Sequence, residues 1–181
     1  MNSVIKVGKL DAARRQLRAA IHNIFHGGDP IVAHTLLGAA SIILTYLVEH
    51  RVPEKSWDRF AQDANALAPG DYFNIMRKAQ NFLKHAKNDP DGSLDLNPTD
   101  TESLAFFAVM NTGELLSHGG LGQLSMDESV FQLWYIACHS LKLEGAADPF
   151  KEALKVFGDL RNAARTDRIA AGRRVLKEYQ Q

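Results

Sequence analysis

Apolar residues recur at intervals of three and four along most of the chain, which is the spacing of one face of an α-helix. The first such stretch runs from about Lys9 to His26, where two glycines interrupt it. Asp29 and Pro30 follow, and these residue types are typical of a helix N-cap and of a first helical position. The pattern therefore predicts one helix that is followed at once by another.

The second stretch, from Ile31 to about His50, is apolar on nearly every side. A helix of that kind is buried rather than laid on a surface. It is about as long as the shortest membrane-spanning helices, but charged amphipathic stretches flank it and can cover it. We therefore expect a central core helix and no contact with a membrane. The polar residues within the stretch are His34, Thr35, Ser41 and Thr45.

Six further helices are predicted downstream from the same spacing and from start and stop signals. Two of them begin with the residues of a capping box, Thr99 with Glu102 and Ser125 with Glu128. We expect the apolar stripe of the fourth helix to include Ile75, and that of the seventh to include Leu154. The six predicted helices cover residues 57–66, 71–87, 99–118, 125–141, 148–164 and 167 onwards.

No stretch alternates apolar and polar residues for long enough to be a convincing strand, and no motif recurs at a fixed period. The predicted fold class is therefore all-α, a helical bundle of seven or eight helices around a buried second helix. Residues 1–181 are expected to form a single domain, which is an ordinary size for one core. The segment 88–98 is rich in Asp, Asn, Pro and Gly, so it is a loop and the best internal boundary.

Composition narrows the classes of function. Lys and Arg number 21, and Asp and Glu also number 21, so no overall field attracts nucleic acid or an anionic membrane. The single cysteine, Cys138, cannot form an internal disulfide, which favours a reducing, cytoplasmic location. The sequence has no phosphate loop, dinucleotide fingerprint or nucleophile elbow, so familiar kinases, dehydrogenases and hydrolases have no sequence support.

The richest polar cluster lies on the fourth predicted helix. Arg77, Asn81 and His85 are four residues apart, so they climb one side of the helix, and Lys84 precedes His85. A histidine that exchanges a proton near neutral pH, beside cations that hold a phosphate, is what cleavage of an RNA phosphodiester needs. The alternative is that these residues form a solvent-exposed face of the helix. The partial negative charge at the helix C-terminus would then favour the protonated form of His85.

Segment 80–85, Gln-Asn-Phe-Leu-Lys-His, resembles the R-x4-6-H motif of HEPN domains, and it is similar to bacterial helical proteins with an Arg-Asn-Phe-Phe-Lys-His-Ala segment. HEPN domains are helical bundles that are often ribonucleases or partners in toxin–antitoxin and defence systems. The resemblance implies that His85 is the catalytic histidine and that Asn81 is the polar residue after the motif's arginine. Gln80 stands at the arginine position, and a neutral amide cannot replace a guanidinium on phosphate. Either Arg77 or Lys84 substitutes for it, or ribonuclease activity is weakened or absent.

A second basic row lies on the first predicted helix, where Arg14, Arg18 and His22 are spaced four apart. The row is a candidate for binding RNA phosphates or an acidic partner, or it is the water-facing side of an amphipathic helix. The basic run over residues 161–177 has the same two interpretations. His22 and His26 have the spacing of two metal ligands, but no third ligand can be assigned, so we predict no metal and no cofactor.

These features lead to two hypotheses about function. The first is a HEPN-like protein that acts on RNA or in defence, with weakened or absent ribonuclease activity. The second is a non-enzymatic helical interaction module that binds a protein or a small ligand. We expect a homodimer, because HEPN-like domains commonly pair and because many apolar helix faces are available for burial.

Overall fold

The computed structural model describes residues 4–87, 89–139 and 148–179. Over these residues the chain forms eight α-helices and one short 3-10 turn, Pro53–Lys55, and no strand. The all-α prediction and the predicted number of helices are confirmed. The helices are α1 (Lys9–Phe25), α2 (Pro30–Arg51), α3 (Trp57–Ala64), α4 (Pro69–Lys84), α5 (Pro98–His118), α6 (Met126–His139), α7 (Asp148–Phe157) and α8 (Arg165–Tyr179).

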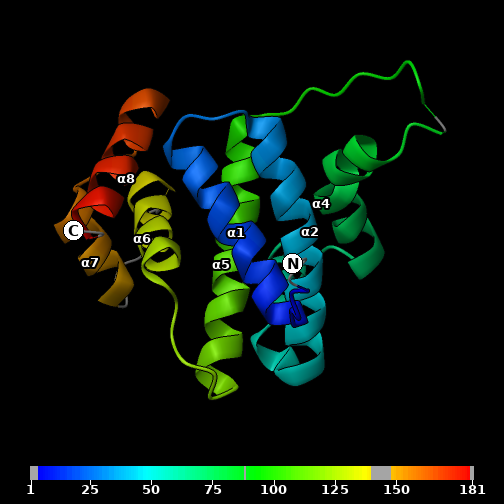
Figure 1. Ribbon diagram of the computed structural model, residues 1–181, viewed down its shortest axis with the longest axis horizontal. Helices are drawn as coiled ribbons and strands as arrows, with labels where there is room; N and C mark the ends of the chain where they lie inside the picture. The colour runs from blue at the N-terminus through cyan, green and yellow to red at the C-terminus, as the bar shows by residue number, and fades with distance from the viewer. Residues whose placement is uncertain (1–3, 88, 140–147, 180–181) are drawn as a thin grey trace.

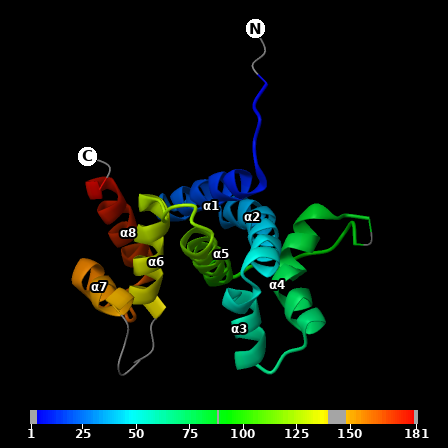
Figure 2. The same ribbon diagram turned by 90° about the horizontal axis from the view of Figure 1, so that it is seen from below.

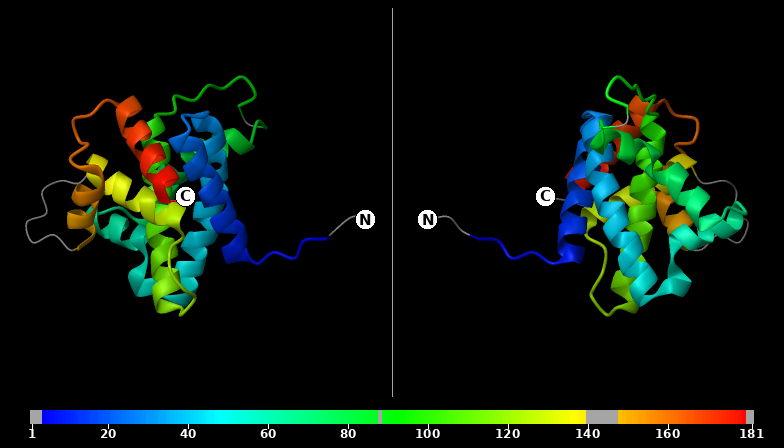
Figure 3. Two further views of the ribbon diagram at one scale, coloured as in Figure 1. Left: turned by 60° about the vertical axis from the view of Figure 1, so that its left-hand side comes forward. Right: turned by 90° about the vertical axis from the view of Figure 1, so that its right-hand side faces the viewer.

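Helices α1, α2 and α5 form the centre of the bundle, and the other helices flank them on two sides (Figure 1). Helices α3 and α4 pack on one flank, and α6, α7 and α8 pack together on the other (Figure 2). Residues 4–8 extend from the start of α1 away from the bundle, and the loop between α4 and α5 crosses one end of the molecule (Figure 3). The central helices therefore lie between the two flanks.

Helix α2 is the core helix that its apolar composition predicts. Its fully buried residues recur at helical spacing and face α1 and α5. By length and composition, α2 is also the one helix among the described residues that could cross a membrane. In the bundle its neighbours cover two sides of it, while Val32 and Tyr46 remain exposed. The buried apolar positions are Ala33, Leu37, Ala40, Leu44 and Val48.

Side-chain caps mark several of the helix starts. Asp29 caps α2 by accepting a hydrogen bond from the Ile31 amide at 2.8 Å, as predicted. The box of Ser125 and Glu128 is also confirmed, because the Ser125 amide donates to Glu128 Oε2 at 2.7 Å and the Glu128 amide donates to Ser125 Oγ at 3.4 Å. At the start of α5 the predicted box of Thr99 and Glu102 is wrong. Asn97 caps that helix instead, and Pro98 takes its first position.

Two helices are shorter than predicted. Helix α4 ends at Lys84 rather than near Lys87, and α7 ends at Phe157 rather than near residue 164. Gly158 follows α7 with a φ of +69°, a left-handed conformation that suits glycine and stops the helix. Two apolar residues expected to face inward are exposed, Ile75 on α4 and Leu154 on α7.

The close approach of α4 to α2 depends on Gly38. A Cβ atom at this position would lie 2.6 Å from Cγ of Gln80, nearer than side chains pack. Gln80 is buried in this interface, and Tyr72 is the other buried residue of α4. The polar Gln80 thus occupies a core position of α4 that the apolar spacing does not reveal.

We predict that Leu37→Asp destabilises the protein by several kcal/mol, because it places an unpaired charge at a fully buried position of α2. Val32→Asp is the matched control, since Val32 is half exposed in the first turn of the same helix, where a carboxylate is favoured. Chemical denaturation followed by circular dichroism measures both variants. Equal stability of the two would show that α2 is not the core helix.

Candidate functional site

His85 lies outside the helix that was predicted to carry it. It follows Lys84 as the C-cap of α4, with an extended backbone at φ −130° and ψ 109°. Its side chain lines a depression of about 740 Å³ together with Lys78, Asn81 and Asp89. We call this hollow, between α4 and the loop that follows it, the His85 depression.

The other residues of the predicted cluster point elsewhere. Arg77 lies over the ring of Phe73, 4.4 Å from its centroid, and near the ring of Tyr46 at 5.8 Å. Gln80 is buried against Gly38, and Lys84 is exposed and does not line the His85 depression. The structure therefore brings together His85 and Asn81, and it separates them from Arg77, Lys84 and Gln80.

The charges around the His85 depression disfavour binding of a phosphate group. The C-terminal end of α4 presents unpaired carbonyl groups and a partial negative charge, which disfavours an anion. Asp89 adds a carboxylate, and Lys78 is the one cation among the lining residues. Cleavage of RNA needs several donors or cations on the phosphate, and this arrangement supplies few of them.

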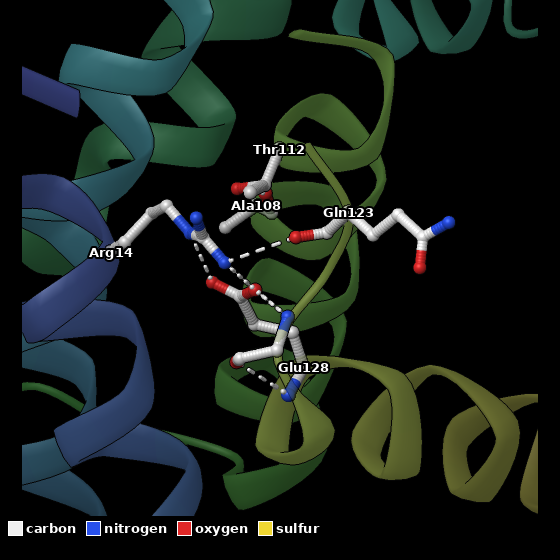
Figure 4. Close-up of polar contacts among 6 residues, drawn as sticks. Arg14, Ala108, Thr112, Gln123 and Glu128 are labelled. Carbon is white, nitrogen blue, oxygen red and sulfur yellow. Dashed lines mark hydrogen bonds and ion pairs between the residues drawn. The ribbon is translucent and has the colours of Figure 1, made fainter. Parts of the chain in front are cut away.

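The basic row of α1 is used within the chain. Arg14 binds Glu128 through a fork, with Nε 2.9 Å from Oε1 and Nη2 2.6 Å from Oε2 (Figure 4). The side chain of Glu128 is fully buried, and this contact raises the pKa of Arg14. His22 Nε2 lies 3.1 Å from Asp127 Oδ1, while Arg18 is half buried. Arg14 and His22 therefore join α1 to the start of α6.

Arginines near the C-terminus are also occupied. Arg165 Nε donates to the buried Glu102 at 2.8 Å, which joins α8 to α5. Burial raises the pKa of Glu102, and Arg165 opposes that rise in part. Arg168 Nε donates to the carbonyl of Ala163 at 3.0 Å, and Arg173 Nε donates to the carbonyl of Phe25 at 2.7 Å. These residues hold helices together, so fewer cations remain for an external polyanion.

A buried carboxylate links four helices, and the sequence pattern did not reveal it. Asp58 accepts hydrogen bonds from Thr45 Oγ1 at 2.8 Å, Tyr72 OH at 2.9 Å and Asn111 Nδ2 at 2.9 Å. Burial and the neighbouring Asp58 raise the pKa of Tyr72 far above its ordinary value. The partners come from α2, α4 and α5, so no local spacing could indicate them.

Beside this network, α2, α3 and α4 enclose a groove of about 580 Å³. We call it the aromatic groove, after Tyr46 and Phe73 in its lining. Arg59 and Arg77 also line it, and Arg59 Nε donates to Glu49 at 2.7 Å. Tyr46 is 62% exposed, and Phe60, one residue after Arg59, is 63% exposed. Two aromatic side chains are therefore exposed, one in the lining of the groove and one on α3 beside Arg59.

The described residues contain no group of three or more His, Cys, Asp or Glu side chains that could hold a metal ion. Cys138 is buried, and burial raises the pKa of its thiol to about 12. A thiol in that environment is not a nucleophile at neutral pH. Searches among known protein families, curated proteins and solved structures find nothing that matches this chain.

We predict that Arg14→Met destabilises the protein by about 3 kcal/mol, because it leaves the buried Glu128 carboxylate without its cation. Arg14→Met combined with Glu128→Gln should recover much of this loss, since no charge then stays buried. Arg15→Met is the matched control, because Arg15 is exposed and pairs with Asp11 one turn away. Urea denaturation of the four proteins measures the effect, and an equal loss for Arg14→Met and Arg15→Met would contradict it.

Proposed function

We propose that this protein is a non-enzymatic helical interaction module that binds a partner protein through the aromatic groove. The observation that carries the proposal is the position of Arg77. The guanidinium lies against Phe73 and Tyr46 inside the groove, and no carboxylate pairs with it in the described part of the chain. Arginine and aromatic side chains are the residues that dominate binding energy at protein interfaces.

The charges of the aromatic groove favour a protein over a polyanion. Arg59 and Arg77 are balanced by Glu49 and Asp63, which line the same groove. A nucleic-acid site needs an excess of cations to release counterions from phosphates. A balanced, aromatic surface instead suits a partner that supplies an apolar side chain and a carboxylate for Arg77.

Catalysis on RNA has less support from the geometry. Gln80 is buried rather than directed at a phosphate, and His85 lies at the negative end of α4. A HEPN-like relationship remains compatible with the proposal, since such domains also serve as partners in defence systems. A homodimer and a cytoplasmic location remain predictions.

We predict that a photo-crosslinking amino acid at position 46, in cells that make the protein, forms a covalent adduct with one partner polypeptide. The same substitution at Tyr179, which is comparably exposed but lies on α8, is the matched control. Arg77→Ala should abolish the adduct at position 46, and mass spectrometry identifies the attached chain. A second copy of this protein in the adduct would confirm the homodimer. Adducts of equal yield at both positions, or none at position 46, would contradict the proposal.

We predict that Gln80→Arg lowers stability by about 2 kcal/mol, because the larger charged side chain must enter the interface beside Gly38. It should bring no gain in RNA cleavage, since position 80 does not face the His85 depression. His85→Ala should leave stability unchanged, because His85 is exposed. Thermal melts and incubation with structured RNA under metal-free conditions measure both. Cleavage that Gln80→Arg strengthens and His85→Ala removes would favour the ribonuclease.

A further inference from the structure

A third hollow, of about 380 Å³, lies on the other side of α4 from the aromatic groove, between α2, α4, α5 and the loop before α5. We call it the His34 cavity. Its walls are largely apolar, with Ile75 and Met76 from α4, Leu94 and Leu96 from the loop and Leu104 from α5. Small-molecule sites have this size and character, with a few polar groups that fix the orientation of the ligand.

His34 is the buried polar group of this cavity. It is 4% exposed, and its Nδ1 lies 3.1 Å from Thr101 Oγ1. Its Nε2 is buried and has no hydrogen-bond partner among the described residues. A buried ring nitrogen without a partner is uncommon in folded proteins, so this atom calls for an explanation.

The tautomer of His34 follows from its neighbour. Thr101 is buried, and the contact with His34 is the one hydrogen bond its hydroxyl makes within the described chain. A buried hydroxyl proton needs an acceptor, so Thr101 donates to Nδ1 and the ring carries its own proton on Nε2. Burial lowers the pKa of His34, which keeps the ring neutral at neutral pH. Nε2–H is therefore a donor that lacks an acceptor.

The remaining polar groups narrow the class of ligand. The hydroxyl of Ser103 is already bonded to the carbonyl of Thr99 at 3.0 Å and to Tyr135 OH at 2.9 Å. Asp95 and Asp100 line the cavity against one cation, Lys78, so the local charge repels an anion. We therefore expect the Nε2–H donor of His34 to bind an uncharged oxygen acceptor.

We propose that the His34 cavity binds an uncharged small molecule with an apolar body and a carbonyl oxygen, which accepts a hydrogen bond from His34 Nε2. The apolar body lies between the side chains of α4 and the leucines of the loop. This site is separate from the aromatic groove, and it does not depend on the function proposed there.

The test is an NMR titration of the full chain, labelled with ¹⁵N in histidine and ¹³C in isoleucine and leucine methyl groups. Hexanamide is the probe, and hexanoate, of the same length but negatively charged, is its control. We expect saturable shifts of the His34 Nε2 signal and of the Ile75 and Leu96 methyl signals with hexanamide. Binding of hexanoate should be at least about tenfold weaker, which is about 1.4 kcal/mol.

Two variants separate the site from a general effect of the probe. Ala79→Phe fills the cavity from α4 and leaves His34 intact, and His34→Phe removes the donor. We expect either variant to weaken hexanamide binding at least about tenfold. Ala79→Phe carries the test if His34→Phe fails to fold. No saturable shift with hexanamide, equal binding of hexanoate, or unchanged binding by Ala79→Phe would each overturn the proposal.

Discussion

The burial of α2 between α1 and α5 is the constraint on which the other features depend. This burial places one side of α2 in the core. The residues on the other sides of α2 line the neighbouring hollows or contact α4. Tyr46 faces outward into the aromatic groove, His34 faces the cavity, and Gly38 lets α4 approach. One helix therefore contributes lining residues to both the aromatic groove and the His34 cavity. A change in its rotation would move His34 and Tyr46 together, since a helix turns as a rigid unit.

Buried carboxylates connect this centre to the two flanks, and each is satisfied differently. Glu128 receives the fork of Arg14, Glu102 receives Arg165, and Asp58 receives three uncharged donors. Arg165 is more exposed than Arg14, so water weakens its attraction, and burial still raises the pKa of Glu102. The net contribution of such a pair to stability is small, because desolvation offsets much of the attraction, but removing one partner leaves a buried charge unpaired. Arg14 and Arg165 pair with carboxylates of the chain itself, so they are not available to bind RNA phosphates.

The sequence could predict what depends on neighbouring residues. Helical spacing, the Asp29 cap and the Ser125–Glu128 box each act within one or two turns, and the structure confirms them. The cap of α5 was misplaced because Asn97 and Pro98 give the same cap-and-proline signal directly before the predicted box. The side chains around the candidate sites, by contrast, are placed by contacts between residues far apart in the sequence. Glu128 pairs with Arg14 although the two residues are 114 positions apart in the sequence. The sequence alone therefore suggests that the cations on α1 are free, whereas Arg14 is paired.

Position 80 shows the same limit from the side of function. The motif comparison interprets Gln80 as a replacement of the catalytic arginine. Spacing along a helix does not reveal that this residue faces the core. In the bundle it is an interface residue whose neighbour is Gly38, and Tyr72 at the other end of α4 binds Asp58. These two contacts orient α4, which borders the His85 depression, the aromatic groove and the His34 cavity. Gln80 therefore shapes all three hollows by holding the helix, without lining any of them.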